Sequence, residues 1–282
     1  MTDERPAPIQ PVSDAAPGPA GLTAEDLVEA TRGRLLRRGP RLARGAAVDS
    51  RLVRPGELFV ALGGERTDGH RFLAAAVAAG ASALLVEQLP DGLDPALLGD
   101  ATIVQVPDAL RGLQAVAGAW RLRFDPLVVG VTGSIAKTST KEAVAAVLGA
   151  DRPTLKSEGN QNNEVGLPLT VLRLGSEHAA AVLEMGMYVG GEIRDLAAIG
   201  RPRIGVVTRV LGVHLSRIGS LDAIEAAKGE LVEALPADGV AILNADDERV
   251  RRMASRTAAR TLSYGFAPDA DVGAVDVRSA GL

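Results

Sequence analysis

The sequence predicts an α/β fold: a small α/β unit followed by a mainly parallel sheet with helices on its faces. Two observations support this. From residue 127 onward, short apolar β-branched runs alternate with helical stretches, which is typical of parallel strands joined by helices. Before residue 125, a strand after a Pro-Gly turn is followed by a helix and a second strand. The 282 residues are enough for two domains of ordinary size.

Composition excludes several classes of protein. Hydrophobic residues make up 46% and aromatic residues 2%, which predicts an aliphatic core. The net charge of −4 argues against a general binder of nucleic acid or of a membrane surface. The absence of cysteine excludes disulfides and thiolate chemistry. No apolar stretch is long enough to cross a bilayer and the N-terminus does not resemble a secretion signal, so we expect a cytoplasmic monomer.

The N-terminal part has local signals for each of its elements. Residues 1–20 are rich in Pro, Ala and Asp, and we expect a disordered tail. Thr23 precedes two acidic residues and is a candidate N-cap. His70 is expected to be structural. We expect strands at 58–62 and 83–87 and helices at 72–80 and 110–123.

Residues 126–148 are the most informative stretch. A buried strand at 127–131 is followed by small residues, by Lys137 and Thr138, and then by apolar residues at helical spacing. This order is typical of a phosphate-binding loop, in which backbone N–H groups face the anion. Lys137 would neutralise the phosphate, and the Thr138 hydroxyl would hold Mg²⁺.

Two residues depart from the usual phosphate-loop pattern. Val131 and Ala136 stand where glycines are expected. If Ala136 needs a left-handed backbone, alanine costs about 1–2 kcal/mol there. The alternative is an ordinary turn between a strand and a helix in a domain that binds no nucleotide.

Candidate ligands follow two of the later strands. Glu184 ends the run 180–184, and His214 follows the run 204–207. In parallel sheets, ligands bind beyond the carboxyl ends of strands, where a carboxylate can reach a metal held by the phosphate loop. As alternatives, Glu184 would cap the helix that begins near Gly190, and His214 would be structural.

Lys228 lies at an unexpected position for a charged residue. It falls four residues after Ile224 and three before Leu231, within the apolar stripe of a helix capped by Ser220. Burial lowers the pKa of a lysine, and a neutral amine can take up CO₂ as a carbamate that ligates metal. The alternative is a lysine that extends its amine to solvent.

An asparagine-rich stretch, Glu158-Gly159-Asn160-Gln161-Asn162-Asn163-Glu164, lies before a helix at 167–174. Its amides suggest hydrogen bonds to a polar substrate, and a surface turn is the alternative.

Taken together, the motifs between Asp49 and Asp247 resemble the Mur ligase family. They are DSR at 49–51, PGELFVAL at 55–62, DGH at 68–70, KTSTKE at 137–142, EGNQNNEVGLPLTVL at 158–172, EMG at 184–186, HL with GS at 214–220, AAKGE at 226–230 and LNADD at 243–247.

The resemblance implies an ATP-dependent amide ligase that joins D-Ala-D-Ala to UDP-N-acetylmuramoyl-tripeptide through an acyl phosphate. It implies two Mg²⁺ ions, the first held by Thr138 and Glu184 and the second by His214 and a carbamylated Lys228. These residues and Lys137 would form the catalytic and metal sites, Asn160, Asn162 and Asn163 would line the substrate channel, and Ser50 would lie at the uridine end. The ATP-binding set would be Gly133, Ser134, Ile135, Ala136, Lys137, Thr138, Ser139 and, beside the adenine, Asn244.

The same resemblance implies a UDP-sugar-binding domain at 21–124 and a central ATP-binding domain at 125–282, with the family's C-terminal domain absent. We therefore expect this chain to bind the UDP-sugar peptide but not to complete ligation. Ala136 would weaken ATP binding, and Arg209 and Leu211 stand where the family has an Asn-Gly turn. Other Mur-type ligases (tripeptide, folylpolyglutamate or cyanophycin synthetases) and a catalytically impaired nucleotide-binding fragment are the alternatives.

Overall fold

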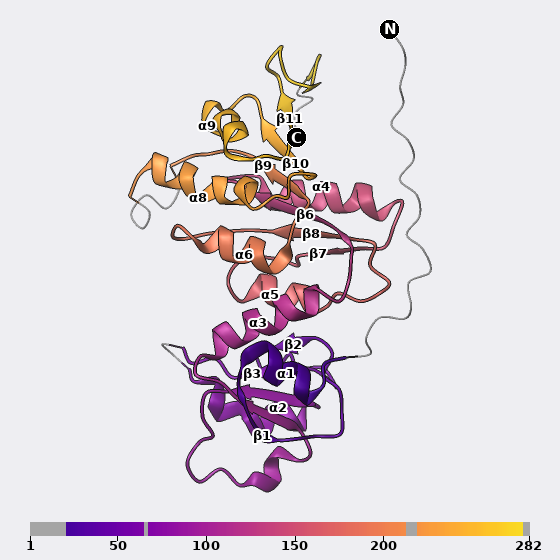
Figure 1. The fold of residues 1–282 in the computed structure, drawn as a ribbon, viewed down its shortest axis with the longest axis vertical. Coiled ribbons are helices and arrows are strands. Elements are labelled where there is room, and N and C mark those ends of the chain that lie inside the picture. Colours follow the sequence, from indigo (N-terminus) through magenta and orange to yellow (C-terminus); the bar gives the residue numbers. More distant parts are fainter. Residues whose placement is uncertain (1–20, 65–66, 213–218, 279–282) are drawn as a thin grey trace.

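A computed structural model describes residues 21–64, 67–212 and 219–278. The tail expected at 1–20 and the candidate ligand His214 lie outside these residues. The described chain contains two β-sheets, with helices α3 (Ala109–Arg121) and α5 (Gly166–Val171) lying between them (Figure 1). The mixed α/β class and the mainly parallel second sheet are as the sequence predicts.

The first sheet has five strands in the order β1-β5-β4-β3-β2. All neighbours are parallel except β1, which runs antiparallel to β5. Its strands are Arg34–Arg37, Ala46–Ala47, Leu58–Val60, Ala83–Val86 and Thr102–Gln105. The accompanying helices are α1 (Ala24–Thr31), η1 (Gly69–Phe72), α2 (Leu73–Ala78) and η2 (Pro95–Leu98).

The second sheet has seven strands, all parallel, in the order β12-β11-β10-β9-β6-β8-β7. In chain order these strands are β6 (Leu127–Thr132), β7 (Thr154–Lys156), β8 (Ala180–Glu184), β9 (Ile204–Val207), β10 (Val240–Asn244), β11 (Arg260–Gly265) and β12 (Val272–Gly273). Its remaining helices are α4 (Lys137–Gly149), α6 (Glu192–Gly200), α8 (Leu221–Glu233), α9 (Glu248–Arg252) and η3 (Met253–Arg256).

Alternate residues of β6 face opposite sides of this sheet. Val129 and Val131 pack with Ala145 of α4. Gly130 points the other way, toward Leu231 of α8, whose Cδ1 would lie 2.9 Å from any added Cβ. The central strand is therefore covered on both faces, which explains its continuous apolar run.

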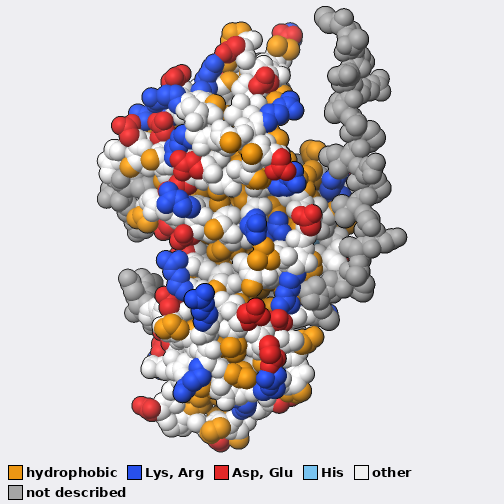
Figure 2. Space-filling view, in the orientation of Figure 1, with side chains coloured by type: hydrophobic (Ala, Val, Ile, Leu, Met, Phe, Trp, Pro, Cys, Tyr) orange, Lys and Arg blue, Asp and Glu red, His pale blue; other side chains and the backbone are white. Residues whose placement is uncertain are grey.

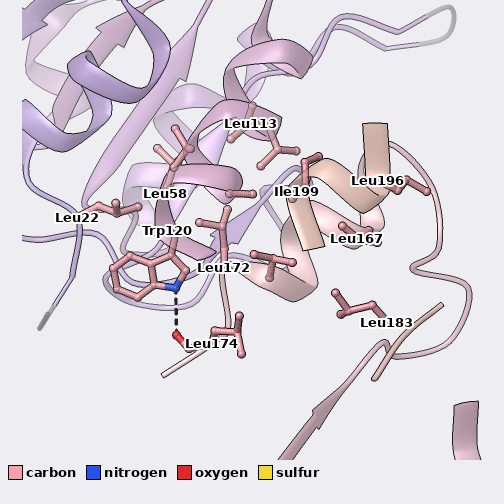
Figure 3. Packing of buried hydrophobic residues seen from close by; sticks show 14 of the residues in the cluster. Leu22, Leu58, Leu113, Trp120, Leu167, Leu172, Leu174, Leu183, Leu196 and Ile199 are labelled. Carbon is pink, nitrogen blue, oxygen red and sulfur yellow. Dashed lines mark hydrogen bonds between the residues drawn. The ribbon is translucent and has the colours of Figure 1, made fainter. Parts of the chain in front are cut away.

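Helix α3 connects the two sheets through a shared core. One cluster of buried side chains runs from the first sheet across α3 to α5, α6 and β8 (Figure 3). At its edge the indole Nε1 of Trp120 donates to the carbonyl of Leu174 at 3.0 Å. A division into domains near residue 124 stays a prediction, since this core is continuous across it.

Most local predictions agree with the structure. The strands Ala180–Glu184 and Ile204–Val207 have the predicted bounds, and Thr23 and Ser220 cap α1 and α8. His70 is structural, as expected: its Nδ1 lies 2.6 Å from Asp68 Oδ1, and its Nε2 accepts from the backbone N–H of Glu87. The helix predicted at 72–80 is shorter, because Asp68 caps a 3₁₀ turn over its first residues.

Charged side chains of both signs are interspersed over the face seen in Figure 2, in keeping with the small net charge. Within the described ranges, every helix is too short or too polar to cross a bilayer.

Candidate functional site

The loop between β6 and α4 has the backbone geometry of an anion site. Helix α4 begins at Lys137, and no side chain caps its N-terminus. The first N–H groups of a helix lack partners inside the helix, so an uncapped N-terminus is suited to an anion. The expected phosphate loop (residues 132–138) lies at the carboxyl end of β6, which is between β9 and β8 in the sheet.

Two positions in this loop have special backbones. Gly133 has φ 148°, and a Cβ there would lie 1.8 Å from Thr208 Oγ1, so only glycine fits. Ala136 has φ 61° and ψ 9°, which is the left-handed region. Sequence analysis expected a cost for alanine if residue 136 had a left-handed backbone. Residue 136 has that backbone, so the cost of alanine relative to glycine is present.

The strand-end segment 208–211 holds the phosphate loop in place. Ser134 donates its backbone N–H to the Arg209 carbonyl at 2.7 Å. Its hydroxyl donates to the Leu211 carbonyl at 3.0 Å and accepts from the Leu211 N–H at 2.9 Å. The Thr208 hydroxyl donates to the Ile135 carbonyl at 2.6 Å. Segment 208–211 is therefore held against the phosphate loop by hydrogen bonds. It stands where the resemblance implies an Asn-Gly turn.

Asp247 supports that segment from the next strand connection. One carboxylate oxygen accepts from the Val210 N–H at 2.8 Å, and the other caps α9. Sequence reasoning missed the roles of Thr208 and Asp247, although Asp247 belongs to the LNADD motif. Asn244 is also used internally: its amide donates to the Thr208 carbonyl at 2.8 Å, and its oxygen accepts from the Asp246 N–H. Its contact with adenine stays a prediction.

The side chain of Lys137 folds back onto the loop that precedes it. Its Nζ donates to the Gly133 carbonyl at 2.9 Å. Burial lowers the pKa of Lys137, and the nearby Glu184 carboxylate opposes that shift. Lys137 and Glu184 thus lie in one neighbourhood, as expected.

Glu184, the last residue of β8, is 2% exposed. Its Oε1 accepts from the Asn162 amide at 2.8 Å, and its Oε2 has no hydrogen-bond partner among the described residues. An orphaned buried carboxylate oxygen is costly unless a cation or donor meets it. Such an oxygen is suited to a hard cation such as Mg²⁺. Thr138, in the first turn of α4, is exposed and its hydroxyl forms no hydrogen bond with described residues, so its role as a metal ligand stays a prediction.

The alternative role for Glu184 as a helix cap is wrong. Helix α6 is capped by Glu230 of α8, whose oxygens accept from the Gly191 N–H at 2.7 Å and the Arg194 N–H at 3.0 Å. Glu230 is buried and lies two residues from Lys228. Through Glu230, α8 contacts the segment between Glu184 and α6. Sequence reasoning did not predict this contact.

Lys228 is 3% exposed, which argues against a lysine that extends to solvent. Burial, together with the nearby Lys137, lowers its pKa to about 7. Lys137 therefore lies close enough to both Glu184 and Lys228 for their charges to interact with its own. In the described part of the chain, no group of three or more His, Asp or Glu side chains is placed to hold a metal ion.

A cavity of about 120 Å³ opens beside Lys137. Asn162 and Asn163 line it, together with Tyr188, Glu192 and Asp195 of the loop and helix after β8. Asn163 also accepts from the N–H of Gly166 at 2.8 Å, at the start of α5.

Two further predicted residues lie apart from this cavity. Asn160 and Ser50 are not among the residues that line it, and Ser50 lies between β2 and β3 of the first sheet. Their contacts with a substrate stay predictions.

Comparison with known proteins places this geometry in a family context. The model of the Mur ligase family, catalytic domain, matches residues 44–120, and that of the Mur ligase middle domain matches residues 131–280. A UDP-N-acetylmuramoyl-tripeptide–D-alanyl-D-alanine ligase from Synechocystis is 41% identical over 77% of this chain and 47% of its own length.

Two solved structures are similar. MurF from Acinetobacter baumannii superposes with a TM-score of 0.81 at 30% identity, over 93% of this chain and 57% of that chain. MurF from Thermotoga maritima in complex with ADP has a TM-score of 0.70 at 33% identity, over 80% and 51%. The chain spans about half the length of the curated relatives it matches.

Proposed function

This chain belongs to the Mur ligase family, and on that premise we propose that it serves an ATP-dependent ligase that joins D-Ala-D-Ala to UDP-N-acetylmuramoyl-tripeptide. The named relatives support this choice within the family. The observation that carries the proposal is the meeting of Lys137, Glu184 and Lys228 beside the uncapped N-terminus of α4. We propose a cytoplasmic monomer with a UDP-sugar-binding domain at 21–124 and an ATP-binding domain at 125–282.

The residues of the phosphate loop would bind and orient the triphosphate. The Nζ of Lys137 would exchange the Gly133 carbonyl for phosphate oxygens, since a charge-assisted bond is stronger than one to a neutral carbonyl. The N–H groups at the start of α4 would face the same oxygens. Residues 133–139 and Asn244 would make up the ATP site.

Phosphoryl transfer requires positioning and neutralisation of charge more than covalent help. Thr138 and Glu184 would hold one Mg²⁺, and His214 with carbamylated Lys228 would hold a second; when bound, the ions neutralise charge on the phosphates. Asn162 fixes one oxygen of Glu184 and leaves the other free for a cation. Asn160, Asn162, Asn163 and Ser50 would contact the UDP-linked peptide, whose terminal carboxylate would accept the phosphoryl group.

Calorimetric titration of the 282-residue chain tests the proposal. We expect binding of Mg²⁺-ATP that is lost in Lys137→Ala, and binding of UDP-N-acetylmuramoyl-tripeptide that is tighter than that of the dipeptide precursor. Lys156→Ala, which removes an exposed lysine on β7, is the matched control and should bind ATP as the wild type does. A folded chain that binds neither ligand would contradict the proposal.

A further inference from the structure

A second, larger cavity lies at the opposite end of the parallel sheet from the phosphate loop. It has a volume of about 1220 Å³. Its walls are the segments that lead into three strands: 121–126 before β6, 175–179 before β8 and 201–203 before β9. Because all these strands are parallel, their amino ends lie a full strand length from Lys137. The cavity is therefore distinct from the site described above.

The walls of this cavity carry more positive than negative charge. Two acidic residues, Asp125 and Glu177, face five arginines: Arg121, Arg123, Arg194, Arg201 and Arg203. Three of the five lie against a carboxylate, in the pairs Arg123–Asp26, Arg203–Asp238 and Arg194–Glu230. Arg121 and Arg201 have no such partner among the described residues.

Arg121 is a buried guanidinium that makes no ion pair with a carboxylate among the described residues. Its Nε donates to the Gly200 carbonyl at 2.9 Å and its Nη1 to the Phe124 carbonyl at 2.7 Å. These acceptors are neutral, although Gly200 lies at the negative end of the α6 dipole. Burial lowers the pKa of Arg121, Asp125 opposes that shift, and Arg201 lowers it further. Since an arginine remains charged in proteins, the cost of burying this charge is only partly offset.

Arg201 occupies a backbone position that suits glycine. It caps the end of α6 with φ 52°, in the left-handed region. Its exposed side chain makes no hydrogen bond or ion pair with the described residues, yet it lines the cavity beside Arg121. Arg32 ends α1 with the same φ of 52°, so this backbone is ordinary at the end of a helix. What distinguishes Arg201 is a guanidinium that faces the cavity without a partner among the described residues.

We propose that this cavity binds a phosphate group, either free phosphate or the phosphate of a small metabolite, through Arg121 and Arg201. Guanidinium groups match the oxygens of a phosphate with paired hydrogen bonds. The volume exceeds that of a phosphate ion, and Leu122, Pro126 and Pro202 offer apolar wall to the rest of a larger ligand. This inference does not depend on the proposed ligase activity.

The test uses a variant in which the phosphate loop no longer binds phosphate, so that binding at this cavity is measured alone. The Lys137→Ala chain is titrated by calorimetry with inorganic phosphate and with ribose 5-phosphate. We expect one binding site to remain, and about tenfold weaker binding when Arg201→Gln is added. Arg71→Gln, an exposed arginine beside the first sheet, is the matched control and should leave binding unchanged. Tighter binding of ribose 5-phosphate would identify a metabolite as the ligand, and equal binding would identify free phosphate.

A second variant separates a ligand role from a structural one. Arg201→Gly relieves the left-handed strain, so we expect a higher melting temperature together with weaker phosphate binding. If the Lys137→Ala chain binds neither probe, or if Arg201→Gln and Arg201→Gly bind as tightly as Lys137→Ala alone, the proposal is wrong.

Discussion

The Asn162 amide donates to one carboxylate oxygen of Glu184 at 2.8 Å, and the second oxygen is buried without a hydrogen-bond partner among the described residues. The fold thus fixes the orientation of this carboxylate, and the nearby Lys137 offsets part of its charge. Stability and cation binding therefore make opposite demands on this residue.

Glu184→Gln tests that opposition. Removing the buried charge should stabilise the chain by no more than about 1–3 kcal/mol, because the charge no longer has to be desolvated while the glutamine NH₂ still lacks a partner among the described residues. The same change should weaken nucleotide binding in Mg²⁺ but not in EDTA. Urea unfolding and calorimetry measure the two effects, with Glu29→Gln, an exposed residue of α1, as the control. An unchanged dependence on Mg²⁺ would contradict the assignment.

Ala136→Gly should stabilise the chain and tighten nucleotide binding. The left-handed backbone costs alanine about 1–2 kcal/mol, and part of the gain is offset because glycine is more flexible when unfolded. We expect a net gain of about 1 kcal/mol in the free energy of unfolding. Ala146→Gly, at an exposed interior position of the same helix, should instead destabilise by about 1 kcal/mol. Equal losses in both variants would count against strain at Ala136.

Lys228 should make stability depend on pH. Its pKa is about 7 in the folded chain, below its ordinary value of 10.5, so the unfolded chain binds more protons between these values. The free energy of unfolding should therefore rise with pH from about 7 to about 10.5, by at most about 1.4 kcal/mol per pH unit. Below pH 7 the penalty for burying the charged amine is fully present. Lys228→Met should show a smaller rise, because the lowered pKa of Lys137 still contributes. If urea unfolding at pH 7, 8 and 9 gives parallel curves for the two proteins, the prediction is wrong.

Glu230→Ala should loosen α6 from α8. The change leaves the N–H groups of Gly191 and Arg194 without acceptors, and we expect a loss of about 1–3 kcal/mol in the free energy of unfolding. Glu233→Ala, which removes an exposed partner of Arg256 on the same helix, should cost at most about 1 kcal/mol. Chemical denaturation compares them, and similar losses would show that the cap is unimportant.

Local patterns predicted much of this chain, because they depend on residues close in sequence. The spacing of Ile224, Lys228 and Leu231 placed the lysine in the apolar stripe of its helix but left open whether its amine is buried, which the structure shows it to be. The apolar run of β8 predicted the bounds of that strand. The contact of Ser134 with Leu211 spans 77 positions, and the cap that Glu230 places on α6 spans 39. A periodic pattern of apolar residues does not predict contacts between residues so far apart in sequence. The hydrogen bonds that segment 208–211 makes to the phosphate loop, and the cap that Glu230 places on α6, were therefore missed. The two-residue strands β2 and β12 were too short to predict. The three-residue β7, Thr154–Lys156, was missed because it has a single apolar residue, unlike β3 of the same length.

The position of Trp120 has a practical consequence. It is the only tryptophan of the chain, and it lies in the core that joins both sheets through α3. A fragment cut near residue 124 would keep α3 but uncover the apolar side that rests on α5 and α6, and should aggregate. Because Trp120 lies in the core that both sheets share, its fluorescence should report whether the two sheets separate in one step when the protein is denatured.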